Sequence, residues 1–394
     1  MALTTRDALV PSAAPMDSRP CFTRVEAFVE PYTATQDIYQ SYYRNSIAAF
    51  CRRERIPFSE IGSRFPDSLR FLRRVRDSPR ARPLMFGRLG IAILDRLAGL
   101  FGADRENPDS AVGCYIFHRA DGAVRVCIDA QDSAPVRRPD LLEWSDLYLK
   151  TNFWPSRPYP AKVVPLANLN PVVLPMQERL KGLRHSLKTL DLFAYFRVWG
   201  GSDELGGVHH NLLLLEALAH VPCRKRLLAY LVSGNIGDTA ARLEKAGIPW
   251  TTRWMPRDEL WRVAASSRLN IVRHGMHQCI PWRMTDLLAM GACPVLDYAA
   301  TTRWHVPLVE GEHYLNLQVP YRPDEGAEVD AGALVGRVLN WLSSADLLTQ
   351  ISRNTARYFD EVLSPEAFGR HIALTAAAVD VAGTTAPRSL EKGI

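Results

Sequence analysis

Short apolar segments alternate with helical segments from Leu190 to Leu363, and this alternation constrains the fold more than any other feature of the chain. Strands that alternate with helices form βα units, and such units build a parallel sheet with helices on both faces. The expected strands are 192–198, 226–232, 250–254, 269–272, 293–296 and 313–317. The expected helices are 209–220, 238–246, 256–266, 281–290, 330–342 and 345–363.

The bulk composition narrows the class of protein. The chain has 394 residues, of which 47% are hydrophobic and 23% charged, which is typical of a soluble globular protein with room for two domains. A net charge of +6 suits an anionic partner without requiring nucleic acid. The seven cysteines contain no Cys-x-x-Cys pair, so we expect neither a disulfide framework nor a zinc site. No apolar run approaches the roughly 20 residues of a spanning helix, and the first residues lack a signal-peptide pattern, which favours a cytoplasmic protein.

The N-terminal half is less regular. A helix is expected over 35–55, and strands over 111–118 and 123–128 flank Ala120-Asp121-Gly122, a typical hairpin turn. Short strands are expected over 146–150 and 162–166, with an aromatic, proline-rich loop between them. The segment 64–82 carries seven arginines, which indicates a solvated helix face or, alternatively, contact with an acidic acceptor or an anionic membrane surface.

Glycines and cationic side chains follow several of the expected strands. Ligands of an open parallel sheet bind at the carboxyl ends of its strands, so these residues are expected to share one edge. Glycine backbone, helix N-termini and arginine forks all suit phosphate oxygens. The pattern therefore predicts a diphosphate site. Its candidate residues are Arg197, Gly200, Gly201, Ser233, Gly234, Arg273, His274, Gly275, His277 and Arg283.

Five of these residues also have a simpler interpretation. Gly200 and Gly201 can serve only as a turn, and Arg197 can form a surface ion pair. His274 and His277 can be solvated loop residues, and no cysteine or carboxylate joins them at the spacing of a zinc site.

The run 275–295, with PWRMTDLLAMGACPVL at its centre, resembles the donor-binding core of GT-B glycosyltransferases, in particular the exostosin-like and group 1-like enzymes. The shared pattern is an arginine, two spacers, an acidic residue, a short apolar helix, a glycine and a Pro-Val pair. This chain has Arg283, Asp286, 287–290, Gly291 and Pro294-Val295 at these places. The resemblance extends over about 190–363. It implies two Rossmann-like α/β domains, an active site in the cleft between them, and C-terminal helices that pack back.

The resemblance also implies roles for individual residues. Arg197 and Arg283 would hold the donor diphosphate, and Asp286 would lie near the nucleotide or sugar, where the family carries Glu. Gly275 and His277 would line the loop that faces the sugar, and Gln278 stands where many retaining members have a Glu. GT-B enzymes usually need no metal, because helix dipoles and cations compensate the charge of the leaving group. We therefore expect no cofactor and no metal.

An inverting reaction also needs a base for the acceptor hydroxyl, which generally comes from the N-terminal domain. Asp129 and Asp132 follow an expected strand, and Asp132 is the favoured candidate, with a turn-forming aspartate as the structural alternative. Lys150, Trp154 and Arg157 are candidates for contact with an acceptor, and they can equally pack the cleft between the domains.

The sequence thus predicts a metal-independent glycosyltransferase that transfers a sugar from a nucleotide sugar to a glycan or lipid-linked glycan, with peripheral contact to an anionic membrane as a further possibility. No nucleic-acid partner is expected. The expected organisation is a tail over 1–20, an acceptor-binding domain over 21–189, a nucleotide-sugar-binding domain over 190–363, and a helix and tail over 364–394.

Three alternatives remain open. A non-catalytic nucleotide- or carbohydrate-binding protein would keep the arginines and lack a base. A nucleotide-sugar-modifying enzyme such as an epimerase would use a similar sheet, although a dinucleotide oxidoreductase is disfavoured because no G-x-G-x-x-G opens a βαβ unit. A GT-A enzyme is disfavoured because Asp129 and Asp132 lack the usual one-residue spacing of its metal-binding acids.

Overall fold

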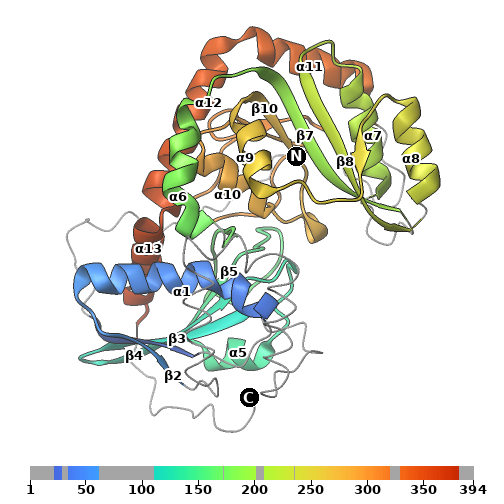
Figure 1. Cartoon of the computed structure of the whole chain (residues 1–394). Coiled ribbons are helices and arrows are strands. Elements are labelled where there is room, and N and C mark those ends of the chain that lie inside the picture. The colour runs from blue at the N-terminus through green and yellow to red at the C-terminus, as the bar shows by residue number, and fades with distance from the viewer. Residues whose placement is uncertain are drawn as a thin grey trace, which may run out of the picture.

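The computed structural model describes residues 22–28, 34–61, 111–171, 173–200, 208–234, 236–319 and 329–380. These residues form two α/β domains, each built on a six-stranded sheet, and the two domains lie one above the other in Figure 1. The predicted class, two α/β domains with C-terminal helices that pack back, is confirmed. No helix in the described ranges is long and apolar enough to cross a bilayer.

The N-terminal sheet is mixed, with the strand order β2-β1-β3-β4-β5-β6. The predicted hairpin is present as β3 and β4, because Ala120 and Asp121 turn the chain and Arg119 pairs with Gly122. β1 pairs antiparallel with β3, whereas the pairs β1–β2, β4–β5 and β5–β6 are parallel. The strands are β1 (Phe22–Phe28), β2 (Phe58–Ile61), β3 (Val112–Arg119), β4 (Gly122–Asp129), β5 (Leu147–Lys150) and β6 (Val163–Pro165).

Two helices cover this sheet from opposite sides. The long helix α1 (Ala34–Glu54) packs Tyr42, Tyr43 and Ile47 against the face that carries Phe117. The short helix α5 (Pro139–Trp144) packs against the other face. The arginine-rich segment 64–82 lies outside the described residues.

The C-terminal sheet is parallel throughout, with the order β9-β8-β7-β10-β11-β12. Counted along the chain within this domain, that order is 3-2-1-4-5-6, the arrangement of a doubly wound dinucleotide-binding sheet. β9 is shorter than the expected segment 250–254. The strands are β7 (Leu190–Gly200), β8 (Lys225–Gly234), β9 (Trp250–Thr251), β10 (Ser267–Val272), β11 (Pro294–Leu296) and β12 (Leu315–Asn316).

Alternate residues of β7 point to opposite faces of the sheet, and each face has its own helices. Leu192, Ala194 and Phe196 pack with α7, α8 and α11, whereas Phe193 and Tyr195 belong to the core that contains α9 and α10. These helices are α7 (Val208–Ala219), α8 (Ile236–Lys245), α9 (Arg257–Ala265), α10 (Trp282–Ala289) and α11 (Ala331–Ser343).

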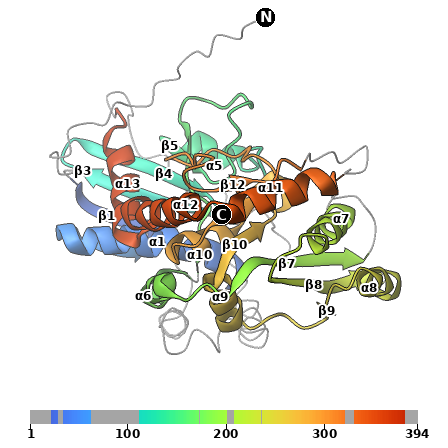
Figure 2. The ribbon, with the colours of Figure 1, turned by 90° about the horizontal axis from the view of Figure 1, so that it is seen from above.

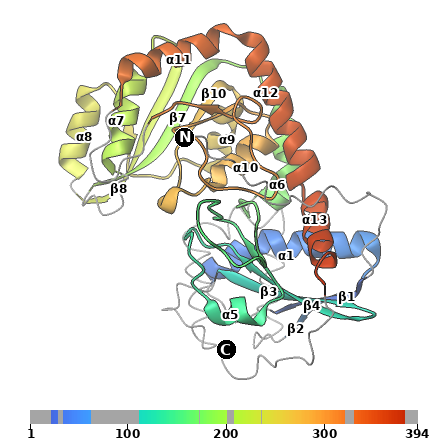
Figure 3. The ribbon, with the colours of Figure 1, turned by 180° about the vertical axis from the view of Figure 1, so that it is seen from behind.

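The chain crosses between the domains twice. α6 (Val173–Gly182) leads into the C-terminal domain, and α12 (Ala345–Tyr358), a wider helical turn at Phe359–Leu363 and α13 (Pro365–Ala377) lead back. α11, α12 and α13 run in succession across the molecule in Figure 2, and Figure 3 shows α13 beside α1. The approach is close, since a Cβ added at Gly369 would lie 2.1 Å from the carbonyl oxygen of Ser46.

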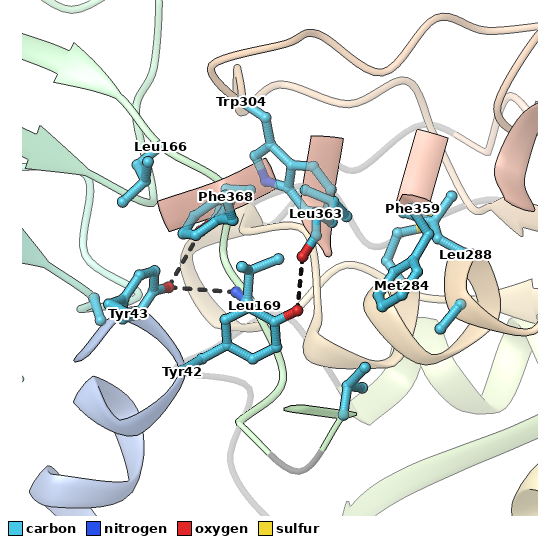
Figure 4. Close-up of a cluster of buried hydrophobic side chains, with 14 of the residues drawn as sticks. Tyr42, Tyr43, Leu166, Leu169, Met284, Leu288, Trp304, Phe359, Leu363 and Phe368 are labelled. Carbon is cyan, nitrogen blue, oxygen red and sulfur yellow. Dashed lines mark hydrogen bonds between the residues drawn. The ribbon is translucent and has the colours of Figure 1, made fainter. Parts of the chain in front are cut away.

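One apolar core runs through the junction and joins the two domains. Figure 4 shows Tyr42 and Tyr43 of α1 together with Met284 and Leu288 of α10 in this core. The Tyr42 hydroxyl donates a 2.7 Å hydrogen bond to the carbonyl of Leu363. Because this core is continuous, residues of the N-terminal domain are held beside the carboxyl ends of the C-terminal strands.

Candidate functional site

The point where the strand order reverses lies between β7 and β10, and it is the place where an open α/β sheet binds its ligands. The chain leaves β7 toward α7 on one face, and it leaves β10 toward α10 on the other. The first turn of α10 lies at this edge, and the backbone amides of a helix N-terminus favour an anion.

Arg283, in the first turn of α10, reaches back over β7. Its Nη1 donates to the carbonyl of Tyr195 at 3.1 Å, and its Cζ lies 4.9 Å from the ring centre of Phe193. Nε and Nη2 are buried and have no hydrogen-bond partner among the described residues. Burial lowers the pKa of Arg283 to about 10, although Asp286 acts in the opposite direction. A buried guanidinium with open donors is well suited to bind an anion.

Arg197 belongs to β7, and its side chain lies on the face of that strand that Arg283 of α10 covers. It follows Phe193 and Tyr195 at two-residue intervals, so its side chain shares their face, and that side chain is exposed. The phenol of Tyr195 interacts electrostatically with both arginines. The structure therefore places Arg197 and Arg283 together. Their contact with a diphosphate stays a prediction.

The loop from β10 to α10 has a strained backbone. Gly275 N donates to the carbonyl of Cys279 at 2.9 Å, and a Cβ added at Gly275 would lie 2.6 Å from the Cys279 sulfur. His277 and Gln278 adopt left-handed φ values of 55° and 57°, which residues other than glycine rarely adopt. The Nε of Arg273 is buried without a hydrogen-bond partner among the described residues. Strain of this kind often accompanies a ligand-binding loop.

The structure describes the backbone of three further candidates at the strand ends, Gly200, Ser233 and Gly234. Gly200 and Gly234 pair across β7 and β8, and Ser233 precedes Gly234 in the same strand. Gly201 lies outside the described residues.

Asp286 serves the packing between the domains. Its Oδ1 accepts from Asn170 Nδ2 at 2.7 Å and its Oδ2 accepts from Trp261 Nε1 at 2.9 Å. Burial raises the pKa of Asp286, whereas these hydrogen bonds and the charges of Arg257 and Arg283 oppose the rise. Both oxygens are thus occupied by protein donors. The predicted contact of Asp286 with the donor would require one of these bonds to open.

A buried polar cluster that was not predicted lies at the same edge. Asp297 follows β11 directly, and its Oδ1 lies 2.6 Å from His274 Nδ1 while its Oδ2 lies 3.3 Å from His210 Nε2. Burial alone would raise the pKa of Asp297, but the two histidines outweigh it and hold that pKa well below the ordinary value. An aspartate immediately after a strand, at the edge where ligands bind, was the available signal in the sequence.

An aromatic group lies beside β9. Trp254 is 55% exposed, and its ring meets those of Tyr195 and Tyr230 edge-on, at centroid distances of 5.9 and 5.0 Å. Met255 N donates to the hydroxyl of Tyr195 at 3.1 Å, which fixes the segment that carries Trp254. An exposed indole ring that is supported in this way can stack on a planar ligand.

Asp132 lies at the boundary between the domains. Its carboxyl is hydrogen-bonded to the thiol of Cys279 and feels the charge of His277, both from the β10–α10 loop. Burial raises the pKa of Asp132, and these two neighbours oppose the rise. The candidate base therefore faces the candidate donor loop.

Lys150 is fully buried within the N-terminal domain. Its Nζ donates to Asp129 Oδ2 at 2.8 Å, and the same oxygen accepts from the Tyr148 hydroxyl at 2.9 Å. In this conformation the buried Lys150 ammonium group cannot contact a sugar acceptor, because it forms an ion pair with Asp129.

Asn152 joins the aromatic loop to the C-terminal domain. Its Oδ1 accepts from Thr302 Oγ1 at 2.8 Å and from Trp154 Nε1 at 3.1 Å, and its Nδ2 donates to the carbonyls of Asp132 and, at 3.2 Å, His277. Trp154 thus lies at the junction, whereas Arg157 is exposed on the adjoining turn. Their contact with an acceptor stays a prediction. No group of three or more metal-ligating side chains occurs in the described part of the chain.

Comparison with solved structures finds glycosyltransferases at low sequence identity. HepE from Anabaena, solved with UDP and glucose, matches with a TM-score of 0.47 and 10% identity over 89% of this chain and 99% of that chain. A glycosyltransferase from Rickettsia africae matches with a TM-score of 0.42 and 9% identity over 90% and 97% of the two chains. MurG from Acinetobacter baumannii matches with a TM-score of 0.38 and 12% identity over 89% and 98%. No model of a protein family and no curated protein matches the sequence.

Proposed function

We propose that this protein is a glycosyltransferase that binds a nucleotide sugar at the switch point of its C-terminal sheet. The observation that carries the proposal is the buried guanidinium of Arg283, whose Nε and Nη2 lack hydrogen-bond partners among the described residues. A buried cation with open donors is unfavourable until an anion arrives, so the site is built for one. A diphosphate fits because Arg197 and the N-terminus of α10 lie at the same edge.

The nucleobase of the donor would lie beside the aromatic group next to β9. Trp254 offers a partly exposed ring close to Tyr195, whose carbonyl is bound by Arg283. A planar base stacked on Trp254 would leave the attached diphosphate near the arginines.

Transfer would occur at the boundary between the domains. The acceptor oxygen forms a bond to the anomeric carbon of the sugar, the bond from that carbon to the diphosphate breaks with its electron pair, and the hydroxyl proton passes to Asp132. The raised pKa of Asp132 suits a general base. In this structure the Asp132 carboxyl is hydrogen-bonded to the Cys279 thiol, so an acceptor hydroxyl would have to replace the thiol.

No metal is required in this proposal, because Arg197, Arg283 and the helix N-terminus would compensate the charge of the leaving diphosphate. The proposed acceptor is a glycan or a lipid-linked glycan. For a lipid-linked acceptor, the arginines of 64–82 would meet an anionic membrane surface, and cosedimentation with vesicles of anionic and of neutral lipid tests that contact.

A panel of nucleotides tests the proposal. Thermal unfolding is measured with UDP-, GDP-, dTDP- and CMP-sugars, since a ligand of the native state raises the transition temperature. We expect one nucleotide class to stabilise the wild type and to lose that effect in Arg283→Met, whereas the exposed Arg262→Met variant on α9 keeps it.

The stabilising donor is then incubated with glycan acceptors, with and without excess EDTA. Transfer that persists in EDTA supports the metal-independent reaction. Strong nucleotide binding without turnover on any acceptor would favour the non-catalytic binding protein. Failure of every nucleotide to bind would overturn the proposal.

A further inference from the structure

The cluster of His210, Asp297 and His274 joins the loop after β10 to the first turn of α7. His274 belongs to the loop between β10 and α10, and His210 lies in the first turn of α7, which follows β7. Asp297 lies between them, with one carboxylate oxygen toward each ring. All three side chains are buried, with 3% exposure for His274, 1% for His210 and none for Asp297. The cluster is therefore a buried polar group at the carboxyl ends of β10 and β11.

Asp297 fixes the orientation of the His274 ring. Its Oδ1 lies 2.6 Å from Nδ1 and also accepts from the backbone amides of His274 and Tyr298, each at 3.2 Å. The ring of Tyr298 stacks on the imidazole at 3.9 Å between centroids, with 12° between the planes. Because Asp297 is ionised, Nδ1 must carry the hydrogen of their hydrogen bond.

The other ring nitrogen of His274 has no protein partner. Nε2 is buried, and no described residue donates to it or accepts from it. A buried polar atom without a partner is unfavourable, and in a native structure it calls for an explanation. The Nε atoms of Arg273 and Arg283 at the same edge are in the same state. The arginine nitrogens are donors and call for acceptor oxygens, and Nε2 of His274 can join them as a donor when the ring is protonated.

We propose that His274 is a diphosphate-binding residue that acts as an imidazolium, with Asp297 as its positioning residue and His210 holding the second carboxylate oxygen. Asp297 accepts the Nδ1 hydrogen, so Nε2 can donate to a phosphate oxygen only when the ring is charged. No proton is transferred, since His274 adds one charge-assisted hydrogen bond to those of the arginines. This inference rests on the proposed function and adds residues that bind the diphosphate or position the residue that binds it.

Two substitutions of His274 test the roles of its two ring nitrogens separately. His274→Asn places an amide near Nδ1, which keeps the bond to Asp297 and removes the donor to the ligand. His274→Gln extends an amide toward the place of Nε2 and keeps an uncharged donor there. Asp297→Asn keeps an acceptor for Nδ1 but removes the negative charge. His220→Asn, at the far end of α7 and exposed, is the matched control.

Isothermal titration compares UDP, GDP, ADP and dTDP, each with its own nucleoside, on these variants. A charge-assisted hydrogen bond corresponds to about 10- to 100-fold in affinity. We expect His274→Asn to lose that factor for the diphosphate that the wild type binds, with the nucleoside affinity unchanged. His274→Gln should lose less, Asp297→Asn should lose at least about 10-fold, and His220→Asn should match the wild type.

Chemical rescue provides a second readout. Imidazole added to His274→Ala should restore part of the diphosphate affinity, and the same addition to His274→Ala with Asp297→Asn should not, because the carboxylate would no longer hold the added ring.

The outcomes separate the two proposals. If the wild type binds no diphosphate more tightly than its nucleoside, the proposed function fails and this inference fails with it. If the wild type does so and folded His274→Asn keeps the same ratio within about twofold, this inference alone is overturned. Equal losses of diphosphate and nucleoside in folded His274→Asn would also overturn it, because such losses indicate a general disturbance of the site.

Discussion

Asn170 Nδ2 donates a 2.7 Å hydrogen bond to Asp286 Oδ1, and this bond ties the segment before α6 to the helix that opens the candidate donor site. Trp261 Nε1 occupies the other carboxylate oxygen. Removing the carboxylate would take away the acceptor of two buried donors beside the charge of Arg283. We expect Asp286→Ala to lower the free energy of unfolding by about 3–5 kcal/mol. Urea denaturation measures the loss.

The donor-binding role that the sequence suggested for Asp286 makes a different prediction. A residue that contacts only the nucleotide or sugar would leave the stability of the ligand-free protein unchanged while affinity falls. Asp286→Asn distinguishes the two roles, because it keeps one acceptor and should cost about 1–3 kcal/mol. A stable Asp286→Ala protein with weak nucleotide binding would contradict the packing role.

Gly369 allows α13 to approach α1 closely. A Cβ at this position would lie 2.1 Å from the Ser46 carbonyl oxygen, so Gly369→Ala must displace one helix. We expect a loss of about 1–3 kcal/mol of stability. Gly336→Ala in α11 is the matched control, since nothing lies within 4 Å of its added Cβ. The control should be neutral or stabilise by about 0.5–1 kcal/mol. Equal effects of the two variants, measured by urea denaturation, would show that the α1–α13 contact is loose.

Arg283 is expected to favour binding at the expense of stability. Burial disfavours its charge, as its lowered pKa of about 10 indicates. Arg283→Met keeps much of the volume and removes the buried charge, so the ligand-free protein should be as stable as the wild type or more stable by about 1 kcal/mol. Its nucleotide affinity should fall about 10- to 100-fold. Thermal unfolding and titration of one sample measure both quantities. Marked destabilisation with unchanged affinity would assign Arg283 a structural role.

The C-terminal sheet was predictable because its strands are buried on both faces and therefore appear as apolar runs bounded by turns. The rule that ligands bind at the carboxyl ends of strands then placed Arg197 and Arg273 at one edge. β1 was not predicted, because its sequence FTRVEAF mixes polar and apolar residues and its partner β3 lies far along the chain. The return of the C-terminal helices was implied by the family resemblance, whereas the pairing of α13 with α1 depends on contacts between the two ends of the chain.

Side-chain pairing was the part of the site that could not be derived from the sequence. His210 and Asp297 are separated by 87 residues, and Asn170 and Asp286 by 116. Local pattern gives no information on contacts at such separations, and an aspartate in a short apolar helix can equally serve a ligand or a buried amide. The fold was therefore predicted better than the partner of each polar group.

The His305 and His371 rings should make the junction between the domains sensitive to acid. Their centroids lie 4.1 Å apart, and burial lowers the pKa of His371 to about 4. Burial and then the charge of His371 hold the pKa of His305 well below its ordinary value, against a hydrogen bond at Val362. In the unfolded chain both titrate near 6.5. Below that pH the unfolded state binds more protons, so stability falls as the pH decreases toward the folded-state values.

We expect the free energy of unfolding to fall by about 1–3 kcal/mol between pH 6.5 and 5. Urea denaturation across this range measures the slope. His371→Asn should flatten it, whereas His185→Asn, on an exposed turn, should leave it unchanged. A slope that is the same in all three proteins would rule out the histidine pair as its source.

Asp132 and Cys279 together should set the pH below which kcat/KM falls, which is the acidic limb of the pH profile. Burial raises the pKa of Asp132, so a reaction that uses it as a base should lose kcat/KM with decreasing pH at values above the ordinary carboxyl range. The Cys279 thiol lowers that pKa by its hydrogen bond, so Cys279→Ala should move the limb to higher pH, and Cys279→Ser should restore it because a hydroxyl still donates.

Asp132→Asn should reduce turnover by about 100- to 10,000-fold with unchanged nucleotide affinity. The pH dependence of sugar transfer by the four proteins measures these effects. An acidic limb that stays in place in Cys279→Ala, in a variant that still folds and binds nucleotide, would show that the group titrating during catalysis is not Asp132. A second carboxylate or histidine would then have to accept the proton of the acceptor hydroxyl.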